Sequence, residues 1–139
     1  MKKLLSMLLL SALALTLVAC GAQNPMKDAL TATRNTGSIE IRVYSITDQT
    51  YTDYVITDRA TVREICDTFS SLKLEKVRIT EPLGTSYSVS FCNAGGIALN
   101  SLAVVAGKNV IDYGDLYRVQ DDFDVHAYVA GLVEGAEQK

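Results

Sequence analysis

The feature that most constrains this chain is one amphipathic helix set between two groups of short alternating segments. Within residues 58–72 the apolar side chains recur at helical spacing, i, i+3, i+4 and i+7: Val62, Ile65, Cys66, Phe69 and Leu72. A helix with a single apolar stripe has to cover another apolar surface, so the flanking segments are expected to form a sheet. The helix starts either with Asp58 as its N-cap or with Thr61 and Glu64 in a capping box, and the sequence leaves both starts open.

The flanking segments alternate between apolar and polar residues with the period of a β-strand. Residues 38–46 place Ile39, Ile41 and Val43 on one face, and residues 51–57 follow after a turn at 47–50, which predicts an antiparallel hairpin. Five more strands are expected at residues 74–80, 87–92, 97–105, 110–113 and 116–119. A second helix is predicted after residue 121, with the apolar stripe Val125, Tyr128, Val129 and Leu132.

The order β-β-α-β-β-β-β-β-α predicts an α+β fold in which the helices pack on one face of a twisted antiparallel sheet. Strands that are neighbours in the sequence are expected to pair as a meander. The domain is predicted to span residues 38–134, with a polar tail at 135–139 and a flexible tether at 20–37. As a coil, a tether of about 17 residues would span about 20–25 Å, and a short helix around Met26–Thr33 is an alternative within it.

Residues 1–19 have the three parts of a secretory signal peptide. Lys2 and Lys3 supply the positive start, residues 4–18 are almost continuously apolar, and a small residue, Ala19, precedes the expected cleavage site. A retained transmembrane helix is the main alternative, but a membrane span needs about 20 apolar residues and this run has about 15. A cleaved secretory peptide without lipid is the next alternative.

The segment Leu17-Val18-Ala19-Cys20 resembles the lipobox of bacterial lipoproteins. The resemblance implies cleavage before Cys20, a thioether-linked diacylglycerol on its sulfur and often a third acyl chain on the new amino terminus. Two or three acyl chains anchor a protein stably, whereas one holds it only marginally. The predicted location is therefore the extracytoplasmic face of the cell membrane.

The rest of the chain carries a second, broader resemblance. The lipobox, the Ile-Thr-Asp at 56–58 and the tyrosine-bounded strands 87–91 and 113–117 are similar to those of small uncharacterised lipoproteins of Gram-positive bacteria. The likeness brings no catalytic motif.

Charge limits the partners of the mature chain. Of the 139 residues, 120 remain after removal of residues 1–19, which suits one domain. The loss of Lys2 and Lys3 from 13 basic residues leaves 11 against 16 acidic ones, a net charge of −5. With no basic run, nucleic acid is not an expected partner, and membrane attachment is expected to depend on the lipid.

Cysteine and histidine suggest no catalytic or metal site. Cys66 and Cys92 form either a disulfide or two buried free thiols, and their predicted positions, on a helix stripe and on the serine side of a strand, favour free thiols. His126 is the single histidine, so a Cys–His pair would need a lowered thiol pKa, and no nucleophile-elbow pattern supports a Ser–His–Asp triad. The acidic residues near the C-terminus lack EF-hand spacing and are expected in caps and turns: Asp112, Asp115, Asp121, Asp122 and Asp124. No catalytic residue, metal ligand or cofactor is assigned.

Tyrosines are the candidates for partner binding, because the side chain is large, stiff and amphipathic. The candidate residues are Tyr44, Tyr54, Tyr113 and Tyr117, and the alternative is that they line the outer faces of strands. If Tyr44 and Tyr54 share the uncovered sheet face with Arg42 and Asp53, that face would dock an envelope protein or peptide. The sequence thus favours a non-catalytic binding or accessory module of the envelope over a small envelope enzyme, a metal-dependent protein or a structural subunit of a larger assembly.

Overall fold

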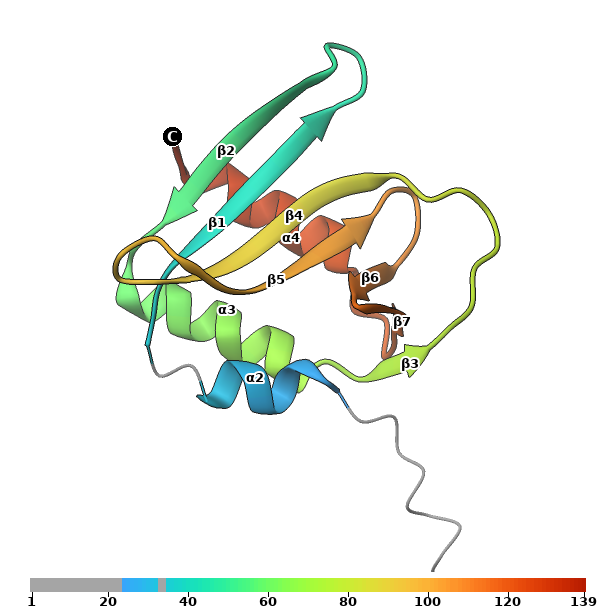
Figure 1. Ribbon diagram of the computed structural model, residues 1–139, viewed down its shortest axis with the longest axis horizontal. Coiled ribbons are helices and arrows are strands. Elements are labelled where there is room, and N and C mark those ends of the chain that lie inside the picture. Colours follow the sequence, from blue (N-terminus) through green and yellow to red (C-terminus); the bar gives the residue numbers. More distant parts are fainter. Residues whose placement is uncertain (1–23, 33–34) are drawn as a thin grey trace, which may run out of the picture.

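One open antiparallel sheet organises residues 24–32 and 35–139, which are the residues that the computed structural model describes (Figure 1). Its strands are β1 (Thr36–Ser45), β2 (Thr50–Ile56), β3 (Leu74–Lys76), β4 (Thr85–Asn93), β5 (Ala98–Val105), β6 (Val110–Tyr113), β7 (Asp115–Val119) and β8 (Glu137–Gln138). The helices are α2 (Met26–Ala32), α3 (Arg59–Ser71) and α4 (Val125–Glu134). The strand order is β3-β7-β6-β5-β4-β1-β2-β8. This confirms the predicted α+β class, and it adds α2 and β8 to the predicted order.

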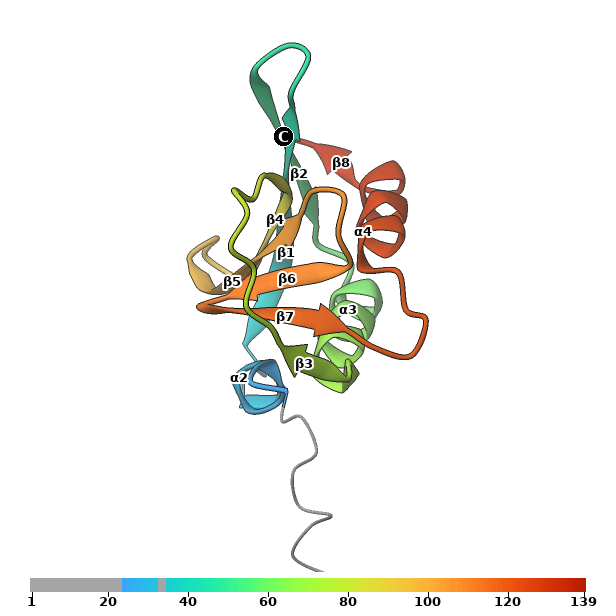
Figure 2. The same cartoon turned by 90° about the vertical axis from the view of Figure 1, so that its right-hand side faces the viewer.

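Helices α3 and α4 lie on the same side of the sheet (Figure 2). The predicted stripe of α3 faces the sheet, and its Phe69 meets Phe91 of β4 edge to face, with ring centroids 5.7 Å apart. Both rings are fully buried, and burial of a phenylalanine contributes roughly 1.5–3 kcal/mol. The helix begins at Asp58, whose Oδ2 accepts a hydrogen bond from the Thr61 backbone N–H at 2.9 Å. Asp58 is therefore the N-cap, which decides between the two predicted starts.

Helix α2 corrects the predicted flexible tether at 20–37 in favour of the alternative, a short helix that starts at Met26. Met26 is fully buried and Leu30 is buried, both within the core cluster. The Asn24 side-chain amide donates to the backbone oxygens of Phe69 and Leu72 at 2.8 and 2.9 Å. These carbonyls lie at the C-terminal end of α3, where the Leu72 N–H reaches the Phe69 oxygen only at 3.5 Å, so Asn24 supplies closer donors. The packed domain therefore starts at Asn24, and of the predicted tether only residues 20–23 and 33–34 lie outside the described residues.

The strand pairing departs from a simple meander at two places. Strands β4 to β7 pair in sequence order, as predicted, but β4 also pairs with β1, and β3 pairs with β7 rather than with β4. The predicted strand 74–80 ends at Lys76, and the loop that follows contains Pro82. A connection of this length is no tight turn, so it lets β3 pair far from β4. The predicted polar tail is also wrong in part, because β8 pairs with Tyr54 and Val55 of β2.

The predicted turn at 93–96 is confirmed and starts β5. The Asn93 Oδ1 accepts from the backbone N–H groups of Gly95 and Ile97 at 2.9 and 3.0 Å. Gly96 has a φ of 77°, a conformation that glycine adopts at little cost. At the far end of β6, Gly114 has a φ of 78° and turns the chain directly into β7. This second turn fixes where the pairing of β6 with β5 stops.

Candidate binding surfaces

The register of the β1–β2 hairpin separates the tyrosines that the sequence analysis grouped together. Directly opposite residues share a face, and Arg42 lies opposite Asp53 while Tyr44 lies opposite Tyr51. Tyr54 lies opposite Ile41, which is fully buried, so it points to the helix-covered face. The condition set for docking on this face, that Tyr44 and Tyr54 share it with Arg42 and Asp53, is therefore met by Tyr44 but not by Tyr54. The sequence alone could have excluded this arrangement, because adjacent residues such as Asp53 and Tyr54 point to opposite faces of a strand.

The two candidates near the C-terminus also belong to the covered face. Tyr113 and Tyr117 are partly buried and pack against the core cluster. The Tyr113 hydroxyl donates to Asn100 Oδ1 at 3.0 Å. Of the four predicted tyrosines, Tyr44 alone lies on the open face. Cys20, the predicted lipidation site, lies outside the described residues.

The open face of the hairpin carries a ladder of charged and aromatic side chains. Arg42 binds Asp53 through two hydrogen bonds, with Nε–Oδ1 at 2.7 Å and Nη2–Oδ2 at 2.9 Å. The hydrogen bond from Arg42 lowers the pKa of Asp53, and the same bond raises the pKa of Arg42. The guanidinium carbon lies 5.6 Å from the centroid of the Tyr51 ring, and that ring lies 4.9 Å from Tyr44. Four side chains thus hold one another in place on the outer part of the hairpin.

The tip of this hairpin exposes two large apolar side chains that were not predicted as binding residues. Ile46 is 75% exposed and Tyr51 is 65% exposed. The hairpin extends away from the body of the molecule, at the end opposite α2 (Figures 1 and 2). The predicted turn at 47–50 would pair Tyr51 with Ile46, whereas the observed turn at 46–49 pairs it with Tyr44.

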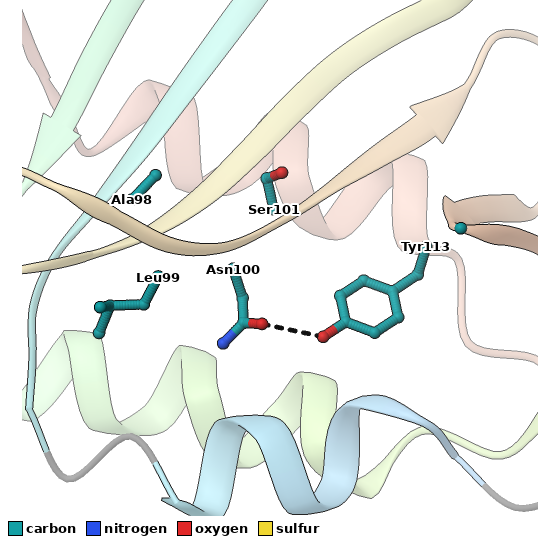
Figure 3. A pocket seen from close by; sticks show the side chains of 6 residues that line it. Ala98, Leu99, Asn100, Ser101 and Tyr113 are labelled. Carbon is teal, nitrogen blue, oxygen red and sulfur yellow. Dashed lines mark hydrogen bonds between the residues drawn. The ribbon is translucent and has the colours of Figure 1, made fainter.

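A second candidate surface is a shallow hollow beside β5. It has a volume of about 350 Å³ and is lined by Ala98, Leu99, Asn100, Ser101, Tyr113 and Gly114. Figure 3 shows the side chains of Leu99, Asn100 and Tyr113 on the side of β5 that faces α2, with the Tyr113–Asn100 hydrogen bond across the hollow. A further hollow of about 520 Å³ lies along the polar face of α3, between residues 60 and 71.

The remaining candidate groups occupy structural positions. Cys66 and Cys92 are separate, buried free thiols, so the disulfide alternative is wrong, and burial raises the pKa of each thiol. The His126 ring packs against Tyr87 at a centroid distance of 4.9 Å. Asp124 caps α4 by accepting from the Ala127 N–H at 2.9 Å. Asp115 pairs with Lys76.

Searches for a metal site and for a membrane span are negative in the described part of the chain. Across residues 24–32 and 35–139, no group of three His, Cys, Asp or Glu side chains is arranged to hold a metal ion. No helix within the same ranges has the length and apolar character that a membrane crossing requires. Comparison of the chain with protein-family models, with curated proteins and with solved structures finds no match.

Proposed function

We propose that this protein is a lipid-anchored binding module without catalytic activity, held through Cys20 at the extracytoplasmic face of the cell membrane. The charged start, the apolar run and the lipobox-like segment before Cys20 support the anchor. The observation that carries the binding role is the hairpin tip, where Ile46 and Tyr51 are exposed on a strand pair ordered by Arg42, Asp53 and Tyr44. Stiff amphipathic side chains of this kind form the centres of protein interfaces.

The position of α2 supports a defined orientation on the membrane. Cys20 precedes Asn24 by four residues, which reach at most about 14 Å when fully extended. The lipid therefore keeps the α2 end of the domain close to the bilayer. The hairpin tip, at the opposite end (Figure 1), projects into the envelope, where its partner is an envelope protein or peptide.

A binding role suits the described residues better than an enzyme does. An active site needs a concave place that gathers titratable groups with displaced pKa. The groups whose pKa is displaced lie instead in ion pairs (Arg42, Asp53, Lys76, Lys139), in a helix cap (Asp58) or on buried and half-buried side chains (Cys66, Tyr87, Cys92, Tyr128). None of them lines either hollow.

The anchor is tested by metabolic labelling of cells with an alkyne-bearing fatty acid. We expect Cys20→Ser to abolish the label on the protein, because the thioether sulfur is lost. Cys92→Ser is the matched control and should keep the label, since this thiol is buried in the folded domain. Equal labelling of the Cys20→Ser variant would overturn the anchor.

The hairpin tip is tested by a photo-crosslinking amino acid placed at Tyr51 in living cells. We expect discrete adducts to appear from this position. The control places the same amino acid at Arg63, an exposed position on the outward side of α3, and should give none of these adducts. Identical adduct patterns from both positions would contradict a role for the hairpin.

A further inference from the structure

Within the part of the chain that the structure describes, strand β5 is paired along its whole length on one edge and along only two residues on the other. On the β4 side, pairing runs from Ala98 to Val105. On the β6 side, only Ala103 and Val104 are paired, opposite Asp112 and Ile111. Among the described residues, 98–102 therefore have no strand on this side, and their outward backbone N–H and C=O groups are left without a ladder partner. Such an edge is a template for another extended chain.

The residues of this edge lack charged side chains and proline, although a register shift between Ala98 and Asn100 bends the strand locally. Natural edges carry charged side chains, proline or a covering element. The whole stretch from Pro82 to Gly107 contains no Asp, Glu, Lys, Arg or His, and residues 98–102 contain no proline. Ala98, Leu99 and Ser101 are exposed, and Leu99 retains 41% of its surface. The edge is therefore uncharged, and it is accessible at residues 98–101, whereas Leu102 at its inner end is buried.

The hollow beside β5 lies where a further strand would run. Gly114 turns the chain away at the end of β6, and beyond this turn the hollow of about 350 Å³ opens along residues 98–101 (Figure 3). The Tyr113–Asn100 hydrogen bond fixes the closed end of the hollow. The neighbouring Ile97 is 66% exposed and extends the apolar surface at the other end.

We infer that the β5 edge binds an extended, uncharged peptide segment of a partner protein, which adds as a strand along residues 98–102. The inference deepens the proposed function and rests on one part of it, that the domain is a binding module. It does not depend on the lipid anchor or on the hairpin tip. Backbone hydrogen bonds supply the pairing, and Ile97 and Leu99 contact small or apolar side chains of the peptide. An uncharged peptide suits this edge better than a charged one, because residues 98–102 carry no charge that could pair with it.

A single strand suits this edge better than a second copy of the chain. A paired strand needs a spacing of about 4.8 Å from β5, whereas a second copy would bring a whole sheet. Helix α2 runs on the side toward which this edge faces (Figures 1 and 3), and a second sheet would have to pass it.

The test uses the detergent-solubilised full chain and an uncharged probe peptide, acetyl-Thr-Val-Ser-Val-Thr-Val-Ser-amide. At about 1 mM peptide we expect amide hydrogen exchange at residues 98–102 to slow by about ten-fold, with little change elsewhere in β5. The same peptide with alternate backbone amides N-methylated, and a version with Glu at alternate positions, should give no protection. Protection by the N-methylated peptide, or none by the parent peptide, would overturn the inference.

Leu99→Lys provides the variant, and Leu83→Lys provides its matched control at a position of similar exposure outside the edge. We expect Leu99→Lys to weaken the binding of the peptide by about ten-fold, because the bound peptide would have to cover a charge. Leu83→Lys should not change the affinity. If Leu99→Lys does not fold, the N-methylated peptide decides alone. Protection of 98–102 that grows with protein concentration without peptide would overturn the inference in favour of self-pairing. The photo-crosslinking and labelling experiments test the proposed function separately.

Discussion

The central strands β1 and β4 are flanked by β2 and β5, and the outer edges of these two strands are covered differently. Beyond β1, strand β2 is covered in part by β8. The Lys139 backbone N–H donates to the backbone oxygen of Asp53 at 2.8 Å. The Lys139 ammonium pairs with the Glu40 carboxylate at 2.7 Å. Beyond β4, the first five residues of β5 have no covering strand among the described residues, and the nearest charge on the neighbouring strand is Asp112, opposite Ala103. On the β2 side the last residues of the chain cover Asp53 to Val55 and leave residues 50–52 without a further strand in the described ranges, whereas on the β5 side no described segment at the end of the chain adds such cover.

The difference suggests separate roles for the outer edges of β2 and β5. Edge protection stabilises the monomer and prevents unwanted pairing, so an unprotected edge is a cost unless something binds it. The β1–β2 hairpin carries Arg42 and Asp53, and charged side chains of this kind discourage pairing with other strands. The uncharged β5 edge retains its backbone pairing capacity for a partner.

The largest expected effect comes from the core that both sides share. Phe91→Ala removes the ring that packs against Phe69, and we expect a loss of about 3–5 kcal/mol in the free energy of unfolding. Both sides should be lost in a single transition, measured by urea unfolding followed by circular dichroism. Phe123→Ala, at a partly buried ring, is the control and should cost clearly less. A second transition for the hairpin would show that the two sides do not share one cooperative core.

Deletion of residues 137–139 removes the strand that pairs with β2, so the outer edge of β2 should become unpaired like that of β5. We expect a loss of about 1–2 kcal/mol, since the β8 pairing and the Lys139 backbone bond disappear. The Lys139 ammonium lowers the pKa of Cys92 against the larger upward shift from burial, so the deletion should raise this pKa further and slow the reaction of the thiol with maleimide. Cys66, which lies in α3, is the internal control. Faster or unchanged labelling of Cys92 would show that loss of the Lys139 charge does not control this thiol.

The sequence predicted the elements of this fold better than the way in which they pair. The helix stripe of Val62, Ile65 and Phe69 and the turn at 93–96 are local patterns, and local patterns survive folding. The pairing of β3 with β7 and of β4 with β1 depends on contacts between distant segments, which no local period encodes. Helix α2 was underestimated because seven residues give a weak pattern, and its stability comes from burial of Met26 and from Asn24 at the end of α3.

The candidate surfaces were predicted less well for a similar reason. Tyr44 is on the open face, but Tyr54, Tyr113 and Tyr117 are tied to the core. The β5 edge was missed because an open edge is an absence of pairing, which becomes visible only when the strand order is known. The long uncharged stretch was the one signal in the sequence that could have indicated it.

A smaller effect is expected from the hydrogen bond that closes the hollow on the open side. Tyr113→Phe removes the hydroxyl that donates to Asn100 and leaves the ring in place. We expect a loss of about 1 kcal/mol, typical of one partly buried hydrogen bond. Hydrogen exchange at residues 98–102 should rise in this variant, whereas exchange in β2 should not. Equal increases in both strands would mean that the bond stabilises the whole sheet and not the β5 edge in particular.

The smallest effect, and the one that separates the two sides by pH, is expected from the Arg42–Asp53 pair. Because Arg42 lowers the pKa of Asp53 below its usual 3.8, the ionised carboxylate favours the folded state, a contribution that is present above about pH 4. As the pH falls below 3.8 and through the folded pKa, Asp53 is protonated and the contribution is lost. Both side chains are largely in solvent, so the effect on thermal stability should be small. Asp53→Asn should lower the melting temperature slightly at pH 6, and its difference from the parent protein should shrink progressively as the pH falls below 3.8. The control, Asp115→Asn, removes the exposed pair with Lys76 near the β3 end of the sheet, and it should leave hydrogen exchange in β2 unchanged. A difference between Asp53→Asn and the parent that stays constant as the pH falls below 3.8 would show that the pair acts through packing and not through charge.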